Sequence, residues 1–308
     1  MKYLIIGKNG QLGKEFQKEL SSKEVVALGH KECDVSNLSQ VLEIFQTYKP
    51  SVVINCSAYN LVDKAEEDYV NAFKVNALGV RNLAFASKKY NAFFVHFSTD
   101  YVFDGNKEDG LYTEEDKPNP INLYGKSKLT GEKWLVEETE DFLLFRVSWV
   151  YGEGKQNFIY KLFQWAENNP YLKVAYDEIS VPTSTRTIVE ISLKSLEKGL
   201  KGLYHLTNSG YASRYEWAKK VFEIKGIDKF IKPVSSDIFN LPAKRPKFSP
   251  MSNRKISSFL NVEINLWDRE LEVFLKKNMW YFFSFLSYIS IKSYNRYLEN
   301  AKEVNLCL

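Results

Sequence analysis

A tyrosine and a lysine stand four residues apart, as Tyr124 and Lys128. In a helix this spacing places both side chains on one face. A phenol can give or take a proton in carbonyl chemistry, and a neighbouring ammonium favours the phenolate and lowers a pKa that normally lies near 10. The pair by itself has low specificity, because both residues are common and helix surfaces bring them together by chance.

A hydroxyl group belongs to the same chemistry. Thr99 follows the apolar segment 93–97, and a hydroxyl at the carboxyl end of a parallel strand opens into the ligand crevice, where it can hydrogen-bond a reacting carbonyl. One connecting segment separates Thr99 from Tyr124, so the three groups can converge. We therefore predict that Thr99, Tyr124 and Lys128 form a proton-delivery set. The alternative is a β-branched strand residue beside an exposed helical pair.

A glycine-rich turn precedes these residues. Gly7, Gly10 and Gly13 follow a short apolar run at the start of the chain and open an amphipathic stretch. Glycines at such a turn allow close approach of the backbone to a pyrophosphate, and the free N–H groups of the following helix favour an anion. The pattern favours dinucleotide binding over a plain glycine-rich turn.

The end of the second predicted strand bears on the choice of cofactor. Enzymes that prefer NADH usually place Asp or Glu at this corner to bind the ribose 2′-hydroxyl. Here the strand is followed by Gly29, His30 and Lys31, and no carboxylate occupies the corner. We predict that His30 and Lys31 meet a 2′-phosphate and that NADPH is used at least as well as NADH. Glu32 is interpreted as a solvated loop acid, although a shift of one or two residues would point it inward.

Two further loops belong to the same edge of the predicted sheet. Asp34 reads either as an ordinary turn or helix-start aspartate or, in a Rossmann-like sheet, as a residue beside the adenine. The segment 55–60 closes the third strand, where small residues let a cofactor run over the sheet edge. The alternative for this segment is a simple exit from strand to loop.

Short apolar runs alternate with amphipathic stretches up to about residue 150. The predicted strands are Tyr3–Ile6, Val25–Leu28, Val52–Asn55, Phe93–Phe97 and Phe142–Val147. The predicted helices are Leu12–Leu20, Leu38–Tyr48, Val70–Tyr90 and Tyr124–Glu138. Strands that are apolar throughout are buried on both faces, and alternation with helices implies right-handed crossovers. Residues 1–150 are therefore predicted to form an α/β, Rossmann-like, doubly wound parallel sheet that binds a dinucleotide.

The regularity weakens beyond Trp149. Helical patterns cover 158–167, 188–198 and 215–225, and 202–206 reads as a strand. We predict a smaller C-terminal α/β substrate-binding part over 151–278, some of whose elements could return to the main sheet. The tail 279–308 differs, since 279–291 is rich in aromatic residues yet shorter than the roughly 20 apolar residues of a membrane-spanning helix.

Composition excludes several classes of protein. The chain has 308 residues, of which 44% are hydrophobic and 26% charged, as in ordinary globular proteins. A net charge of +4 is too small to indicate a nucleic-acid surface. Cys33, Cys56 and Cys307 are far apart and lack metal-ligand spacing, which favours reduced thiols in a cytoplasm. The apolar run before Gly7 is too short for a secretory signal.

Taken together, the glycine turn, the strand-end Thr and the Tyr-x-x-x-Lys pair resemble the extended short-chain dehydrogenase/reductases. Within that superfamily the chain resembles the dTDP-4-dehydrorhamnose reductase family, from residue 1 to about 277. The blocks that carry the resemblance are 7–13, 62–66, 98–105, 124–132, 146–152, 181–183, 202–206 and 243–246.

The resemblance implies reduction of the 4-keto group of a dTDP-6-deoxyhexulose to dTDP-L-rhamnose by a reduced nicotinamide, in the biosynthesis of cell-surface polysaccharide. Catalytic roles would fall to Tyr124, Lys128 and Thr99. The residues implied to line the cofactor are Gly7, Gly10, Gln11, Leu12, Gly13, Asp34, Val35, Ala58, Tyr59 and Asn60, with Tyr124 and Lys128 at the nicotinamide ribose. Thr99, Asp100 and Trp149 would meet the substrate; without the resemblance, Trp149 reads as a core tryptophan.

The chain departs from the family pattern at two places. Ser180 stands where a glycine usually lies two residues before the proline, so an altered substrate-facing backbone is expected there. The tail after Asn278 has no counterpart.

Other functions stay open. Epimerisation or 4,6-dehydration of a nucleotide sugar is one, although dehydration typically uses an Asp-Glu pair after the strand-end Thr, and Asp100 is followed here by Tyr101. Another is a regulatory subunit that keeps the fold and the cofactor, as one reductase-like subunit of methionine adenosyltransferase does. A homodimer is an open alternative to a monomer, and the sequence does not decide whether a metal is needed.

Overall fold

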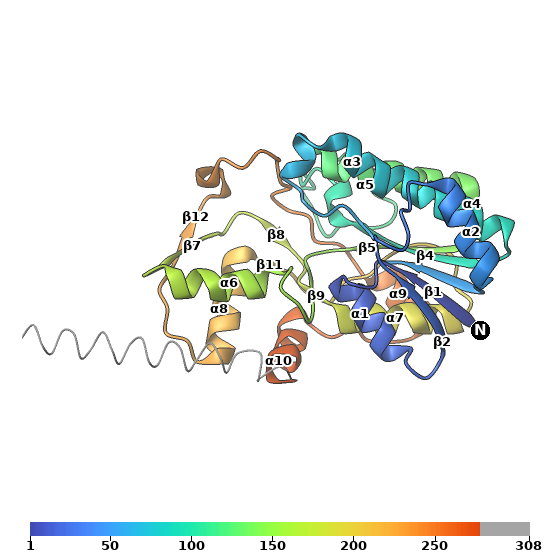
Figure 1. Cartoon of the computed structure of the whole chain (residues 1–308). Helices are drawn as coiled ribbons and strands as arrows, with labels where there is room; N and C mark the ends of the chain where they lie inside the picture. The colour runs from blue at the N-terminus through green and yellow to red at the C-terminus, as the bar shows by residue number, and fades with distance from the viewer. Residues whose placement is uncertain (278–308) are drawn as a thin grey trace, which may run out of the picture.

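The computed structural model describes residues 1–277, and its centre is a six-stranded sheet in which every neighbouring pair is parallel (Figure 1). In spatial order the strands are β10 (Gly202–His205), β5 (Phe142–Val147), β4 (Phe93–Thr99), β3 (Val52–Asn55), β1 (Lys2–Ile6) and β2 (Glu24–Leu28). The chain order reverses between β1 and β3, and the crevice at such a switch point is where open parallel sheets bind ligands. Because β10 pairs with β5, the sheet takes in a strand from beyond residue 150.

Helices cover both faces of this sheet, as strands buried on both sides require. One core lies under α1 (Gln11–Glu19), α7 (Thr185–Glu197) and α9 (Arg254–Leu260), and the other under α2 (Leu38–Tyr48), α4 (Gly79–Lys89) and α5 (Leu123–Glu138). Successive side chains of β1 alternate between the two cores, with Ile5 in the first and Leu4 in the second. The predicted doubly wound α/β fold is confirmed.

The helix predicted over 70–90 is present from Tyr69 to Lys89, but it contains a π-helical turn that was not predicted. It is divided into α3 (Tyr69–Phe73), a π-helical turn (Lys74–Leu78) and α4. Asn76, in the π-helical turn, is 1% exposed and bonds to the loop after β3. The π-helical turn thus accompanies a buried polar side chain directed inward, a packing demand that helical periodicity does not report.

The remaining elements build a smaller part beside the sheet, on the left in Figure 1. Its core is formed by α6 (Phe158–Asn168), α8 (Arg214–Lys225), α10 (Trp267–Lys277) and the paired strands β7 (Leu172–Ala175) and β12 (Ile231–Val234). Two short pairs join it to the sheet region: β6 (Val150–Tyr151) with β9 (Thr183–Ser184), and β8 (Ile179–Ser180) with β11 (Ala212–Ser213).

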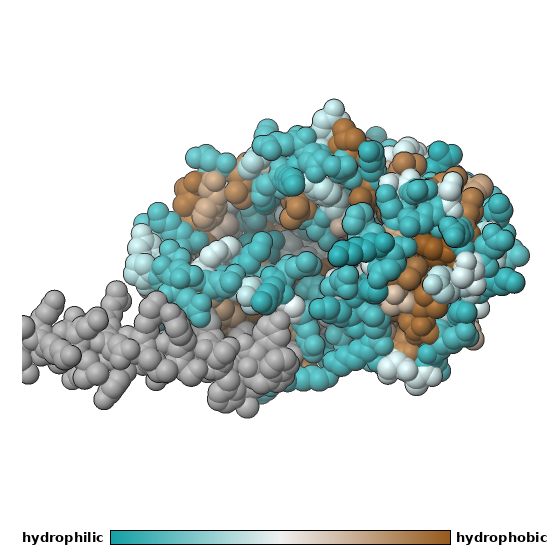
Figure 2. Space-filling view, viewed as in Figure 1, coloured by the Kyte–Doolittle hydropathy of each residue, from teal (hydrophilic) through white to brown (hydrophobic). Residues whose placement is uncertain are grey.

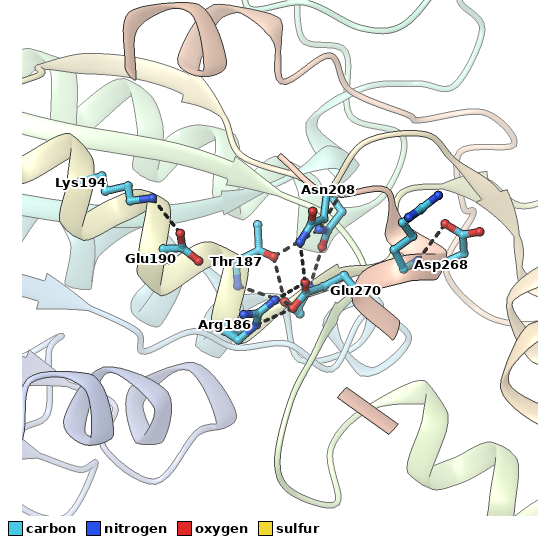
Figure 3. A network of polar contacts seen from close by, with 10 residues as sticks. Arg186, Thr187, Glu190, Lys194, Asn208, Asp268 and Glu270 are labelled. Atoms are coloured by element: carbon cyan, nitrogen blue, oxygen red, sulfur yellow. Dashed lines mark hydrogen bonds and ion pairs between the residues drawn. The ribbon is translucent and has the colours of Figure 1, made fainter. Parts of the chain in front are cut away.

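A polar network attaches α10 to α7 (Figure 3). Arg186 at the start of α7 donates from Nε to Oε1 of Glu270, 2.8 Å away, and Ser184 donates to the same oxygen over 2.9 Å. Glu270 is 1% exposed; burial raises the pKa of its carboxyl, but the bonds and charge of Arg186, with the bonds from Ser184 and Asn265, together lower it. The network therefore attaches the first turn of α10, the last described helix, to α7.

The face drawn in Figure 2 is largely hydrophilic, with apolar side chains gathered over several segments. On and just after the 3₁₀ helix η4 (Ser236–Phe239), the exposed apolar side chains include Ile238, Phe239 and Leu241. Among residues 1–277 no helix combines the length and the apolar character needed to cross a membrane. The aromatic-rich tail 279–308 lies outside the described residues.

Candidate active site

The glycine turn joins β1 to α1 at the switch point. Gly7 has a φ of +89°, and a Cβ there would lie 2.7 Å from the backbone nitrogen of Ser57. A Cβ on Gly13 would lie 2.3 Å from the carbonyl oxygen of Gly7. Helix α1 begins after Gly10 with no side-chain cap and with no acidic residue in its first turn. Its first N–H groups are thus free of a side-chain acceptor and suit an anion.

The two residues after Gly10 make different contacts. Gln11 donates from Nε2 to the carbonyl oxygen of Val150 over 3.1 Å, which ties the glycine turn to β6. Leu12 packs against the core under α1. Contacts of either residue with a cofactor stay predictions.

The corner after β2 differs in one respect from expectation. His30 and Lys31 are exposed, in keeping with a site for an incoming phosphate. Glu32 is exposed, as expected of a solvated loop acid, but it is not free: its carboxylate accepts from the Gly29 N–H at 2.8 Å and pairs with Lys8 at 2.7 Å. The bond from Lys8, followed by that from Gly29, lowers the pKa of Glu32. The carboxylate is thus held back against the glycine turn.

The next loop holds Asp34 in a local turn. Its Oδ1 accepts from the N–H and the hydroxyl of Ser36, at 3.0 and 2.8 Å, and these bonds lower its pKa. Val35 is 5% exposed and packs so closely on Gly79 that a Cβ there would lie 2.4 Å from its Cγ2. The contacts among described residues are those of a turn aspartate and a core valine, and the adenine contacts stay predictions.

The loop after β3 is fixed by Asn76, a residue that the sequence did not single out. Its Oδ1 accepts from the Tyr59 N–H at 2.8 Å, and its Nδ2 donates to the Tyr59 carbonyl and the Ser127 hydroxyl, each at 3.0 Å. Ala58 and Tyr59 are half-buried and Asn60 is exposed at this edge. One buried amide therefore links the loop to α5.

Asp100 is directed inward. It is 2% exposed, and Ser180 and Ser249 donate to its Oδ2 at 2.8 and 2.6 Å, while Thr99 donates to Oδ1 at 3.2 Å. Burial raises its pKa, and the three hydroxyl bonds act in the opposite direction. Ser180, the departure from the family pattern, also bonds to Ser148 at 2.8 Å and so fits a polar network. A substrate contact by Asp100 stays a prediction.

Tyr124 lies in the first turn of α5, whose start is fixed from two sides. Asn122 caps the helix by accepting from Gly125 N–H at 2.7 Å, and its Nδ2 donates to the Lys244 carbonyl at 2.8 Å. Glu66 accepts from the Leu123 N–H at 2.8 Å. The helix begins at Leu123, one residue before the predicted start, and the asparagine directly before it is a residue type that favours helix caps.

The expected lowering of the Tyr124 pKa by Lys128 was wrong. Burial raises the pKa of Tyr124 and outweighs the opposite effect of the neighbouring Thr99 hydroxyl. Lys128 is 2% exposed, and its Nζ donates to the Phe97 carbonyl at 2.6 Å. Burial lowers the pKa of Lys128 to about 8. Tyr124 is therefore a neutral phenol, the protonation state that a proton donor needs.

Trp149 follows β5 with a φ of +42°, a conformation that bulky side chains rarely adopt. The guanidinium of Arg214 lies 3.5 Å from the centre of its ring, and Trp217 stacks on it with ring centres 5.7 Å apart. Arg214 is held in turn by Glu178 at 3.8 Å. Arg214 and Trp217 are far from Trp149 in the sequence, so no local pattern could have indicated these contacts.

Two ion pairs connect sequence blocks that are far apart in the chain. Arg245 binds Asp63 at 2.6 Å, and Arg146 of β5 binds Glu132 of α5 at 2.7 Å with both side chains buried. The blocks were recognised from the sequence, but their pairing was not.

Among residues 1–277 no cluster of His, Cys, Asp or Glu is arranged to hold a metal ion.

A glycine turn at the switch point of a doubly wound sheet, a strand-end Thr99, and Tyr124 with Lys128 on one helix define an extended short-chain dehydrogenase/reductase. The family model described as the RmlD substrate binding domain matches residues 1–279. The dTDP-4-dehydrorhamnose reductase of Aggregatibacter actinomycetemcomitans is 34% identical, covering 87% of this chain and 96% of that protein. The spore coat polysaccharide biosynthesis protein SpsK of Bacillus subtilis is 35% identical, covering 90% and 97%.

A solved structure gives the same result. The dTDP-4-dehydrorhamnose reductase of Bacillus anthracis in complex with NADP has a TM-score of 0.86 and 36% identity, and the match covers 90% of this chain and all (100%) of that chain. The chain belongs to the dTDP-4-dehydrorhamnose reductase family.

Proposed function

We propose that this protein reduces the 4-keto group of dTDP-4-dehydro-L-rhamnose to the alcohol of dTDP-L-rhamnose, with NADPH as reductant. The observation that carries the proposal is the position of Tyr124, a buried phenol in the first turn of α5 whose pKa is raised by burial and influenced by Thr99 at the carboxyl end of β4. Reduction of a ketone needs a proton donor at this position, and family membership gives the substrate class.

The residues of the glycine turn fit the cofactor. The backbone of the turn packs closely on neighbouring backbone, since a Cβ at Gly7 or Gly13 would collide with backbone atoms. The uncapped start of α1 offers N–H groups to a pyrophosphate. His30 and Lys31 would hold the 2′-phosphate, and Lys128 would hold the nicotinamide ribose. Bound there, the reduced nicotinamide supplies the hydride that adds to C4 of the sugar.

The protein's own part in the reaction is the proton. Tyr124 Oη gives its proton to the carbonyl oxygen as the C4–H bond forms, which leaves an alcohol and a phenolate that solvent reprotonates. Thr99 orients the carbonyl by a hydrogen bond, and Trp149, held by Arg214, packs against the sugar. Because burial raises the phenol pKa, the proton stays on Tyr124 until negative charge develops on the substrate oxygen.

Turnover tests the proposal. The purified chain, mixed with dTDP-4-dehydro-L-rhamnose and NADPH, is expected to oxidise the nucleotide. Tyr124→Phe should lose about 10² to 10⁴-fold in kcat while nucleotide binding persists, as for loss of a general acid. Tyr101→Phe removes a neighbouring phenol whose ring centre lies 5.9 Å away and serves as the matched control that keeps turnover. Equal turnover in Tyr124→Phe and wild type contradicts the mechanism.

A regulatory subunit is the second candidate, because intact site residues can persist in such proteins. It predicts nucleotide binding without turnover in the same assay.

We also propose a cytoplasmic location, supported by the free thiols of Cys33 and Cys56. A homodimer is a further proposal, and sedimentation equilibrium of the full chain tests it.

A further inference from the structure

A series of polar side chains leads to Lys128. It begins at Ser57 in the loop after β3 and continues through Asn55 in β3 and His96 in β4. Asn55 ends β3 and is the register partner of His96 in β4, so the two side chains lie across from one another. Their exposed fractions are 1% and 0%. Asn55 Nδ2 lies 3.2 Å from His96 Nδ1, and His96 Nε2 lies 3.5 Å from Lys128 Nζ. The proposed reaction does not use either residue directly.

The orientation of the amide is fixed by its other partner. Asn55 Oδ1 accepts from the backbone N–H of Ser57 at 3.0 Å and from its hydroxyl at 2.6 Å. A backbone N–H can only donate, so the atom that faces it must be the amide oxygen. The NH₂ group of Asn55 therefore faces the imidazole.

This orientation determines the tautomer of His96. An amide NH₂ can only donate, so Nδ1 must be the accepting nitrogen, and the neutral ring carries its proton on Nε2. That Nε2–H faces Lys128. An ammonium has three donors and no lone pair, so it cannot bond to an N–H. One of the three donors is used by the Phe97 carbonyl at 2.6 Å.

We propose that Asn55 and His96 are positioning residues for Lys128: the amide holds the imidazole in its Nε2–H tautomer, which denies the lysine an acceptor on that side and leaves its remaining N–H groups for the ribose hydroxyls of the cofactor. The inference rests on the proposed function for the role of Lys128 toward the nucleotide. The tautomer itself follows from the hydrogen bonds and does not depend on that function.

The electrostatic surroundings of Lys128 agree with this arrangement. On the strand side the facing titratable group is His96, whose pKa is lowered by burial and then by Lys128. On α5 itself Glu132 acts to raise the pKa of Lys128, and Tyr124 lies one helical turn before the lysine. Beyond the start of α5, Glu66 binds Leu123 N–H and Asp100 binds hydroxyls.

The first experiment reads the tautomer directly. The chain has three histidines, so ¹⁵N-histidine labelling and long-range ¹H–¹⁵N spectra give three ring patterns. His96 is expected as neutral Nε2–H. His205 is an internal reference of the opposite kind, because its Nδ1 lies 3.2 Å from the Tyr112 carbonyl and must carry the proton there. A His96 ring that is Nδ1–H or doubly protonated at pH 7.5 overturns the proposal.

The second experiment switches the tautomer. In Asn55→Asp the new carboxylate still accepts hydrogen bonds from Ser57, but it can only accept on the side of His96, so Nδ1 must become the donor. His96 should therefore change to the Nδ1–H tautomer, and its Nε2 can then accept a hydrogen bond from the ammonium of Lys128. We expect the KM for NADPH to rise several-fold. In the pH profile of kcat/KM, the alkaline limb should move up by about one pH unit, because an acceptor beside the Lys128 ammonium raises the pKa of the lysine. NADPH affinity, measured by fluorescence titration, should fall in parallel.

Ser57→Ala is the matched control. It removes one bond to Asn55 but keeps the backbone N–H that orients the amide, so the His96 spectrum and the alkaline limb should not move. An Asn55→Asp protein that keeps the Nε2–H tautomer, or whose limb moves without a change of tautomer, overturns the proposal. If the wild-type chain has no turnover, the proposed function fails, while the spectra and the NADPH titration still decide on the positioning role.

Discussion

Replacing Glu132 by Gln tests how the helix that carries Tyr124 is attached to the sheet. Glu132 of α5 and Arg146 of β5 form a bidentate pair, with Nη2 at 2.7 Å from Oε2 and Nε at 3.1 Å from Oε1. Their side chains are 5% and 4% exposed. Glutamine has the same shape as glutamate, so the change removes the negative charge and leaves a buried guanidinium without its counterion.

The expected loss follows from that burial. Breaking a buried ion pair by changing one partner typically costs about 3 to 5 kcal/mol, since the remaining charge stays desolvated. The amide oxygen of Gln can still accept one bond from Arg146, which favours the lower end, about 3 kcal/mol. The free energy of unfolding of a domain is roughly 5 to 15 kcal/mol, so the variant should still fold but with a much smaller free energy of unfolding. Glu132 also raises the pKa of Lys128, so the alkaline limb of kcat/KM should move down.

Urea unfolding followed by both fluorescence and circular dichroism measures the free energy of unfolding. The control is Glu272→Gln, in an exposed pair with Lys276, which should show no measurable change. A double variant, Glu132→Leu with Arg146→Met, should recover much of the loss because it removes both charges. A loss below about 1 kcal/mol in Glu132→Gln would refute the reasoning that this pair is ionised and desolvated.

Three further predictions concern the cofactor, the tail and pH. Lys31→Glu should weaken NADPH binding more than NADH binding, as a carboxylate repels the 2′-phosphate; an unchanged ratio of kcat/KM for the two nucleotides removes the role assigned to this corner. A chain ending at Asn278 should fold and turn over, and loss of the folded state on truncation would show that the tail belongs to the core. Burial lowers the pKa of His96, and of His205 to about 3, so the unfolded chain binds more protons below about pH 6.5. Stability should therefore fall as the pH drops from 6.5, by up to about 1.4 kcal/mol per unit for each histidine, and equal unfolding midpoints at pH 7 and 5.5 would contradict this.

Much of the fold could be read from local patterns. The strands Val52–Asn55 and Phe142–Val147 and the helix Leu38–Tyr48 have the predicted bounds. Apolar runs report burial on both faces and amphipathic runs report one buried face, so such elements need no knowledge of their partners. The π-helical turn at Lys74–Leu78 was missed because the contacts that accompany it, from Asn76 to the Tyr59 N–H and to the Ser127 hydroxyl, are not local.

The sequence also determined the types and order of the chemical groups. A glycine turn, a strand-end threonine and a Tyr-x-x-x-Lys pair have fixed spacing along the chain, and that spacing follows from turn and helix geometry. It could not give their electrostatic state. The sequence indicated a phenol with a lowered pKa, because Lys128 lies one helical turn away, whereas the structure buries Tyr124 and directs the ammonium to Phe97.

Tertiary structure alone decided which groups meet. Glu32 turns back to Gly29, Asp100 turns inward to Ser180 and Ser249, and Arg214 stacks on Trp149. These partners lie from 3 to 149 residues apart in the chain. Desolvation and hydrogen bonding depend on the final positions of all surrounding atoms, which spacing along one chain does not specify. The sequence therefore predicted which residues would form the site, whereas their orientations and the directions of their pKa shifts came from the packing.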